Sequence, residues 1–369
     1  MSRHAYWIVA LFFLALVLAK FSPQTGFTSL IRFGGSSPYP QHRALHDLPV
    51  AIVPKSNGYD GQFYAQIALD PLLRSGDLDQ VLDSPAYRAR RILVPAFAAV
   101  FGLGQPWWTL QAYALINVIC WLVLGWMLYR YIGGNDWVAF ARWAGCMLSM
   151  GVLDSVRQSL VDLPALMLLV FAANACMASR PGRSTLYLAL GNLAKETNML
   201  GAIALHAGPR PRWRAVLVSL LLAGLPLLVW SLYVQHRFSN SSPGSGFGNF
   251  DWPLLGLLTQ VKLALREIQY GNWDGRYGFS LIAIIGLFTQ ALLLWSSPQL
   301  KSSWWRIGAA YSFLLLFLSF WVWSGYWAAC RAVLPMTIAF NLLLPATGRF
   351  WLWWALGNLT LLHAIWRFL

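Results

Sequence analysis

Long apolar segments with almost no charge recur along this chain, and they restrict its fold more than any other feature. Two examples are Ala5 to Leu18 and Leu110 to Leu128. Of the 369 residues, 58% are hydrophobic and 11% are charged, whereas a typical soluble domain has about 25% charged residues. One water-soluble core could not bury so many apolar side chains. The sequence therefore predicts an all-α polytopic membrane protein and excludes disordered, collagenous and coiled-coil chains.

The apolar segments also indicate how often the chain crosses the membrane, because one helical crossing needs roughly 20 apolar residues. Segments of about this length are residues 5–21, 108–130, 137–153, 159–178, 213–235, 279–296, 304–323, 328–346 and 350–367. Ile92 to Leu103 is too short to cross, and Ser184 to His206 has Asn192, Lys195 and Glu196 in its middle. We expect a single domain over residues 1–369 with about 9–11 transmembrane helices.

Lysine and arginine residues in short loops predict the orientation, since cytoplasmic loops are enriched in both. With a cytoplasmic N-terminus, ten of them lie in inside loops and only Arg157 and Arg331 in short outside loops. This requires residues 184–206 to enter and leave on one side, as two half-length helices that meet at Asn192 to Thr197. Such backbone is tolerated only where it is buried in protein or lines a cavity. The net charge of +14 is spread over these loops, so nucleic acid is not an expected partner.

Two loops on the predicted outer face, residues 22–91 and 236–278, are too long to be simple connections. In the second loop, Asp251-Trp-Pro opens a stretch whose apolar and polar residues predict a capped amphipathic helix on the bilayer surface. The first loop has similar helical segments and six of the thirteen acidic residues, all between Asp47 and Asp83. We therefore expect the first loop to be catalytic.

Asp60 is the acidic residue of most interest, and two interpretations of it are open. It follows Tyr59 and precedes an expected short helix, Gln62 to Leu69. Its carboxylate could cap that helix. Alternatively it could act on a ligand, which the adjacent Gly61 would allow to come close to the backbone.

Three arginines near the end of the first loop, Arg88, Arg90 and Arg91, could bind phosphate, because a guanidinium matches phosphate with paired hydrogen bonds. The alternative is that they anchor the chain to lipid headgroups. Arg331 likewise either binds phosphate or extends to the membrane surface.

Other charged residues also allow either a contact with substrate or a structural role. Lys195 could bind a phosphate, or Lys195 and Glu196 could only satisfy neighbouring groups. Arg157 could contact substrate, whereas Asp162 fits a helix N-terminus, where it complements the dipole. The histidines and the four cysteines lack the spacing of metal ligands, so no metal-binding residues are expected.

Three short motifs carry a resemblance to a known family. They are Tyr59-Asp-Gly-Gln-Phe-Tyr64, Tyr87-Arg-Ala-Arg-Arg-Ile-Leu-Val-Pro95 and Leu193-Ala-Lys-Glu-Thr197. In this layout the chain resembles the GT-C superfamily of multi-spanning glycosyltransferases, in particular its poorly characterised bacterial members. The likeness covers most of the chain in layout but only these motifs in residues.

The resemblance implies an activity and assigns roles to the motif residues. It implies transfer of a sugar from a polyprenyl-phosphate donor to a glycan, lipid or protein acceptor outside the cytoplasm, with Asp60 as the catalytic base. Tyr59 and Tyr64 would then bind substrate together with the basic residues above and Glu196. The family often has a D-x-D or E-x-D pair where this chain has Tyr-Asp-Gly, and this departure leaves metal dependence open. Members that use a polyprenyl-phosphate sugar commonly need no metal, so the resemblance favours a reaction without a cofactor over one with a divalent metal.

A one-step displacement of the lipid phosphate needs a base for the acceptor hydroxyl and cations for the departing phosphate, and it would invert the anomeric carbon. We therefore expect an inverting glycosyltransferase in a bacterial inner membrane, with a cytoplasmic N-terminus. A transporter or flippase for lipid-linked or anionic substrates is the alternative, since intramembrane charges could line its pathway. The lack of an internal repeat argues against an inverted-repeat transporter. An accessory subunit is a third possibility.

Overall fold

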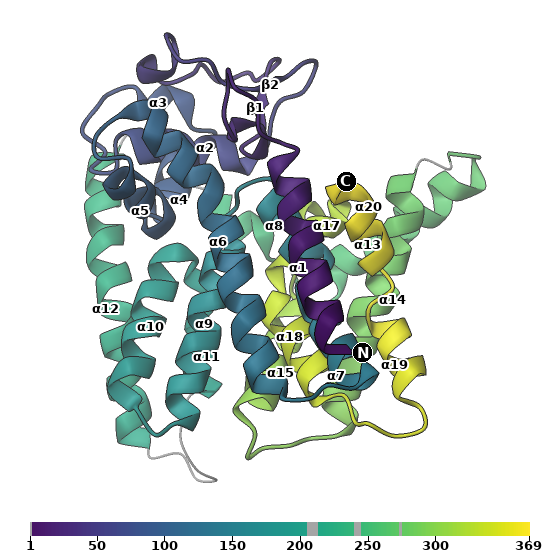
Figure 1. The fold of residues 1–369 in the computed structure, drawn as a ribbon. Coiled ribbons are helices and arrows are strands. Elements are labelled where there is room, and N and C mark those ends of the chain that lie inside the picture. Colours follow the sequence, from purple (N-terminus) through teal and green to yellow (C-terminus); the bar gives the residue numbers. More distant parts are fainter. Residues whose placement is uncertain (1, 205–212, 240–244, 273–274) are drawn as a thin grey trace.

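The chain folds almost entirely into helices, as the sequence predicts (Figure 1). The computed structural model describes residues 2–204, 213–239, 245–272 and 275–369. In this part the only sheet has two short parallel strands, β1 (Phe33–Gly34) and β2 (Ile52–Val53). The expectation of an all-α protein is therefore confirmed for the described residues.

Three helices in the described part are long and apolar enough to cross a membrane. They are α6 (Pro106–Ile132), α12 (Trp213–Arg237) and α14 (Gly275–Ser296). The pair α17 (Tyr326–Ala332) and α18 (Leu334–Leu343), bent by 66°, would add a fourth if it is counted as one broken span. Shorter apolar helices are α1 (Ser2–Leu18) and α9 (Asp162–Met177). By length and composition these are the helices of a membrane protein.

Besides the segment that forms the bent pair α17 and α18, three of the expected spans are not continuous helices, and this part of the prediction is wrong. The segments divide into α7 (Trp137–Met147) and α8 (Met150–Arg157), α15 (Ser303–Leu316) and α16 (Phe320–Ser324), and α19 (Phe350–Gly357) and α20 (Leu361–Phe368). At one break the backbone of Leu318 forms a bridge with Phe250 instead of continuing the helix. At another, the buried Asn358 side chain donates to Asn341 Oδ1 at 3.0 Å. Long-range partners interrupt the helices, and apolar composition alone gives no sign of them.

The segment with polar residues in its middle is broken as expected. Helix α10 (Pro181–Ala194) ends at Lys195, whose extended backbone leads into η3 (Glu196–Asn198) and α11 (Met199–Ala204). Ala202 lines the same cavity as Pro181, so α11 returns alongside the start of α10. His206, where this segment was expected to end, lies outside the described residues.

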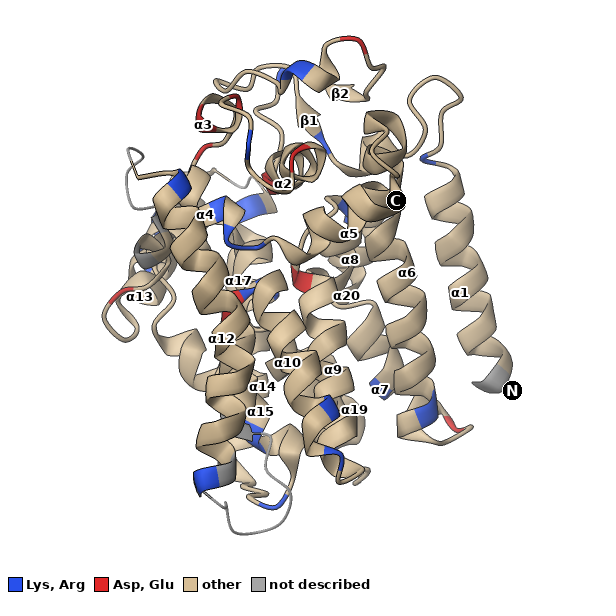
Figure 2. Ribbon diagram, turned by 90° about the vertical axis from the view of Figure 1, so that its left-hand side faces the viewer, with Lys and Arg blue, Asp and Glu red and all other residues tan. Residues whose placement is uncertain are grey.

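The first long loop forms a cap at one end of the helices (Figure 1). Its elements are η1 (Thr28–Leu30), the two strands, η2 (Arg43–Leu45), α2 (Asp60–Leu69), α3 (Leu78–Val81) and α4 (Pro85–Ala89), and α5 (Leu93–Phe101) follows. Acidic residues gather around α2 and α3, whereas the opposite end carries mainly Lys and Arg (Figure 2). A β-carbon added to Gly61 would overlap the carbonyl oxygen of Gln158, so this glycine lets α2 lie directly on the backbone after α8.

The described part of the second long loop contains η4 (Ser245–Asn249) and the amphipathic helix α13 (Leu255–Gln269). The expectation that Asp251 caps this helix is wrong. The helix begins after Leu254, and Asp251 instead accepts a hydrogen bond from the Trp252 N–H at 2.8 Å. Asn249 Nδ2 donates to the hydroxyl of Tyr87 at 3.0 Å, so the two long loops meet.

Candidate functional site

A cavity of about 220 Å³ lies where the first loop meets the helices. Its polar side is formed by the starts of α2, α9 and η3 together with α4 and α17, and its apolar side by η4, α15 and α16. Of the residues expected in a substrate site, seven line it: Tyr59, Asp60, Tyr64, Arg91, Lys195, Glu196 and Arg331. Residues far apart in the sequence thus converge on one space.

Asp60 lies at the start of α2, but its carboxylate does not cap that helix. No side chain caps α2, and Asp60 Oδ1 instead accepts from Arg88 Nη2 at 2.8 Å. Both carboxylate oxygens of Asp83 bind the same guanidinium, at 2.8 and 2.7 Å. Burial opposes ionisation of Asp60, but the positive charges of Arg88 and Arg331 outweigh it and hold the pKa of the carboxyl below its usual value. Asp60 is therefore a carboxylate at neutral pH, held by Arg88 beside the cavity.

Arg91 is held from three sides. Its Nε and Nη2 donate to the two carboxylate oxygens of Glu196 at 2.9 and 2.7 Å. Its remaining bonds go to the hydroxyls of Tyr64 at 2.9 Å and Tyr87 at 2.6 Å. The fixed guanidinium ties the connection between α4 and α5 to the tip of the broken helix pair.

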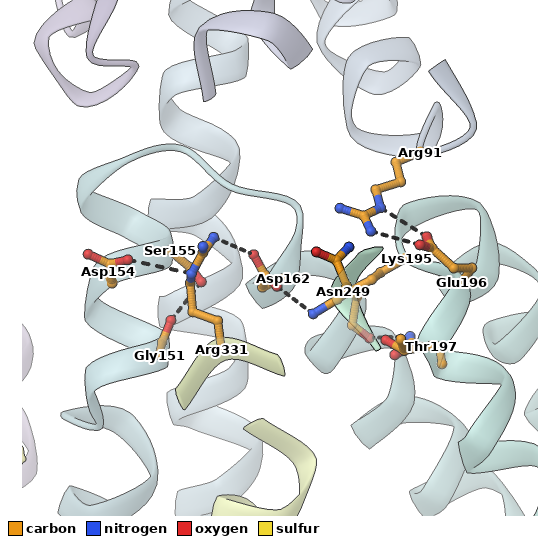
Figure 3. Close-up of polar contacts among 12 residues, drawn as sticks. Arg91, Gly151, Asp154, Ser155, Asp162, Lys195, Glu196, Thr197, Asn249 and Arg331 are labelled. Carbon is orange, nitrogen blue, oxygen red and sulfur yellow. Dashed lines mark hydrogen bonds and ion pairs between the residues drawn. The ribbon is translucent and has the colours of Figure 1, made fainter. Parts of the chain in front are cut away.

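Figure 3 shows a row of alternating charges on the other side of the cavity. Arg331 lies 3.6 Å from Asp154 and 3.2 Å from Asp162, and the other oxygen of Asp162 accepts from Lys195 Nζ at 2.6 Å. These side chains are between 2% and 12% exposed, which makes the pairing necessary, since a buried unpaired charge is very costly. Asp162 thus does more than complement the dipole of α9, because it holds both Arg331 and Lys195.

Three tyrosine hydroxyls around the cavity have unused hydrogens. A hydroxyl has one donor and two acceptor positions. The hydroxyl of Tyr59 accepts from Trp327 Nε1 and Arg331 Nη2, that of Tyr87 accepts from Arg91 and Asn249, and that of Tyr64 accepts from Arg91 and, at 3.5 Å, Arg88. Within the described residues none of these three hydroxyls donates to another group. Burial raises the pKa of both Tyr59 and Tyr87, so these hydroxyls keep their hydrogens at neutral pH.

Lys195 is a cavity cation with unused donors. An ammonium group has three N–H bonds, and within the described residues only Asp162 accepts one. Arg91 spends nearly all of its donors on Glu196 and the two tyrosines. Lys195 and the tyrosine hydroxyls therefore provide a set of hydrogen-bond donors for the oxygens of a ligand.

The remaining three expected residues, Arg88, Arg90 and Arg157, lie outside the cavity lining. Arg90 packs over the ring of Tyr87, with its Cζ 5.4 Å from the ring centroid. Arg157 ends α8, on the far side of Arg331. Arg88 also does not line the cavity and acts on it through Asp60.

Sequence reasoning did not assign Tyr87 or Asn249 to the site, and it left Trp327 open between stacking on a sugar and a place in the interfacial aromatic belt. Tyr87 was within reach, since it opens the motif that contains the three arginines. Trp327 precedes Arg331 by one helical turn, so the two side chains lie on the same face of α17. Asn249 gives no signal in the sequence, because its partner Tyr87 lies in the other loop.

The apolar side of the cavity is formed by Phe250, Leu314, Leu318, Trp321 and Val322. Trp321 is 74% exposed at the edge of this surface. The cavity therefore joins a charged, hydrogen-bonding half to an apolar half. The described residues contain no group of three or more His, Cys, Asp or Glu side chains placed to hold a metal ion.

Comparison of the chain with protein-family models, with curated proteins and with solved structures gives no match. The function must therefore be argued from the site itself.

Proposed function

We propose that this chain is an integral-membrane glycosyltransferase of the GT-C type, which transfers a sugar from a polyprenyl-phosphate donor to an acceptor outside the cytoplasm. The observation that carries the proposal is the cavity, in which the Asp60 carboxylate faces unused O–H and N–H donors beside an apolar surface. The donor phosphate would lie against Lys195 and the tyrosines, and the prenyl chain against Leu318 and Trp321.

The reaction then follows from the positions of these groups. The acceptor hydroxyl oxygen attacks the anomeric carbon, the bond from that carbon to the phosphate oxygen breaks, and the phosphate leaves with the electron pair. Lys195, Arg331 and the hydroxyl of Tyr59 stabilise the charge that develops on it. Asp60 accepts the hydroxyl proton. Because Arg88 lowers the basicity of Asp60, the proton moves late, after the new bond has made the acceptor oxygen more acidic.

The remaining parts of the proposal concern placement in the membrane. We infer a bacterial inner membrane with about 9–11 crossings, a cytoplasmic N-terminus and the cavity on the outer side, from the excess of Lys and Arg at the opposite end (Figure 2). The four cysteines are buried, so cysteines introduced at Ser56 and at Ser302 can be labelled selectively. An impermeant thiol reagent should label the first in intact cells and the second only after permeabilisation. Equal labelling of both in intact cells would contradict this orientation.

The proposed activity is tested by incubating the purified protein in vesicles with radiolabelled polyprenyl-phosphate sugars and extracted cell-envelope acceptors. The alternative, a flippase, is favoured by the broken helices α10/α11 and α17/α18, because discontinuous helices form the binding sites of many transporters. In the same vesicles a flippase would move the labelled lipid between leaflets without forming a glycosylated product. Product formation that requires Asp60 supports the transferase, and movement without transfer refutes it.

A further inference from the structure

A second cluster of positive charge lies outside the cavity, on the far side of Arg331. It consists of Arg32, between η1 and β1, Arg157, at the end of α8, and Arg367, in the last turn of α20. Helix α8 packs against α20, which brings Arg157 and Arg367 together. We define these three residues as the outer arginine cluster.

The close contact at Gly61 explains how Arg32 joins this cluster. A β-carbon on Gly61 would lie 3.0 Å from the carbonyl oxygen of Ile31 and would overlap that of Gln158. The neighbours in sequence of these two residues are Arg32 and Arg157. The charges of Arg32 and Arg367 both act on Arg157, so the three guanidiniums lie within range of mutual repulsion.

The cluster has too little negative charge to neutralise it. The nearest carboxylate is Asp154, which lies 3.6 Å from Arg367 and 3.6 Å from Arg331. In the row of alternating charges, Asp154 and Asp162 already balance Arg331 and Lys195. Arg32 and Arg157 are therefore left without a carboxylate of their own among the described residues, and Arg367 shares Asp154 with Arg331.

The hydrogen-bond donors of the cluster are equally unmatched. Arg32 and Arg157 are half-buried, and neither side chain makes a hydrogen bond or ion pair within the described residues. Arg367 lies over the ring of Trp327, with its Cζ 4.6 Å from the ring centroid, and its buried Nη1 has no hydrogen-bond partner among the described residues. Removing guanidiniums from water without a partner costs free energy, and a ligand with several acceptor oxygens would offset this cost.

We propose that Arg32, Arg157 and Arg367 form a second oxyanion-binding site, which takes a phosphate group. Three neighbouring guanidiniums can supply the charge-assisted bonds that the oxygens of a phosphate monoester prefer. The phosphate belongs either to a small soluble ester or to a lipid headgroup. This site is separate from the cavity and does not depend on the proposed sugar transfer.

The site is connected to the cavity through shared residues. Trp327 lies against Arg367 and donates to the hydroxyl of Tyr59, which lines the cavity. Asp154 lies between Arg367 and Arg331. A phosphate bound to Arg367 would weaken its hold on Asp154 and leave that carboxylate to Arg331.

The experiment measures the melting temperature of the full-length protein in neutral detergent. One series compares inorganic phosphate with chloride at equal ionic strength, and a second compares phosphatidic acid with phosphatidylcholine in mixed micelles. All measurements are made in a Lys195→Gln background, which removes the main phosphate ligand of the cavity. Binding to the folded state raises the melting temperature with ligand concentration.

The variants are Arg157→Gln and Arg32→Gln, and the matched control is Arg74→Gln, an exposed arginine of the same loop. Without phosphate, Arg157→Gln should melt at the same temperature or higher, because it removes repulsion from two guanidiniums. With phosphate, the rise in melting temperature should be lost in Arg157→Gln and Arg32→Gln and retained in Arg74→Gln.

The two series identify the source of the phosphate. A response to both inorganic phosphate and phosphatidic acid that the two variants abolish supports a small phosphate ligand, and a response to phosphatidic acid alone supports a lipid headgroup. Equal responses in the variants and the control, or no response in either series, would overturn the proposal. Loss of sugar transfer in other assays would not affect this result.

Discussion

Asp60→Asn is the substitution that best separates catalysis from structure, because asparagine keeps the shape of the side chain and removes its charge. Asp60 makes one bond to Arg88, at 2.8 Å, while Asp83 binds the same guanidinium through both oxygens. Removing one partner of a buried ion pair costs about 3–5 kcal/mol when the other charge is left alone. Here Arg88 stays paired, so we expect the loss of one charge-assisted hydrogen bond, about 1.5–3 kcal/mol of unfolding free energy at most.

The effect on turnover should be larger than the effect on stability. Loss of an acid–base group lowers the rate by about 10²- to 10⁴-fold, which corresponds to about 3–5 kcal/mol in the activation free energy. The matched control is Asp83→Asn. This substitution weakens the binding of the Arg88 guanidinium at a residue that does not line the cavity. The assay is transfer of labelled sugar from polyprenyl phosphate at equal protein abundance, with thermal denaturation measured in parallel.

The two variants give a clear decision. If Asp60 is the base, Asp60→Asn loses turnover while Asp83→Asn loses stability but keeps most of its activity. If the two variants lose turnover equally, Asp60 serves only to hold Arg88, and the mechanism proposed above is refuted.

Three further outcomes follow from the contacts described. Lys195→Gln should raise the KM for the donor more than it lowers kcat, since a phosphate contact of equal strength before and during reaction acts on binding; an unchanged KM would remove Lys195 from the phosphate site. Gly61→Ala should cost about 1–3 kcal/mol of unfolding free energy in denaturant titrations, because the added methyl overlaps the carbonyl of Gln158, whereas Gly76→Ala, with open space around it, should cost about 0.5 kcal/mol or less. Burial lowers the pKa of His42, and Asp77 opposes this shift only in part. The imidazole of the unfolded chain therefore takes up a proton at a higher pH than that of the folded chain, and stability should fall as the pH drops below about 6.5. His42→Gln should make the melting temperature less dependent on pH between about pH 7 and 5, and an unchanged dependence would exclude this histidine.

The break in the helix pair could be predicted from the sequence because its cause is local. Lys195 and Glu196 interrupt an otherwise apolar segment, and continuous helix there would place both charges in hydrocarbon. The clustering of acidic residues in the first loop was informative for the same reason, since composition shows it directly.

The role of Asp60 could not be predicted from the local sequence. A carboxylate at the start of a helix is an ordinary N-terminal feature, and the competing partner, Arg88, lies 28 residues further along the chain. Gly61 was expected to admit a ligand, but the close approach is to the protein backbone at Gln158. Both outcomes depend on how α2 packs, which local sequence does not determine.

The local sequence also does not determine where the expected spans break or where Arg157 lies. Leu318 leaves its helix because Phe250, in another loop, pairs with it. Arg157 was expected to contact substrate, but it lies outside the cavity lining. Its helix, α8, packs against α20 as well as α17. Apolar length predicts that a segment is helical, and its long-range partners decide where the helix ends.

For the proposed glycosyltransferase, the pairing of charges around the cavity has a consequence for how quickly the protein meets its donor. Among the described lining residues, Asp60, Asp162 and Glu196 offset Arg91, Lys195 and Arg331, so the lining itself has no net charge with which to draw an anionic headgroup inward. Encounter would then be governed by lateral diffusion of the lipid in the bilayer and by contact with the apolar edge at Trp321. The rate of donor capture should therefore change little with ionic strength, unlike that of enzymes that attract soluble anions to an open basic cleft.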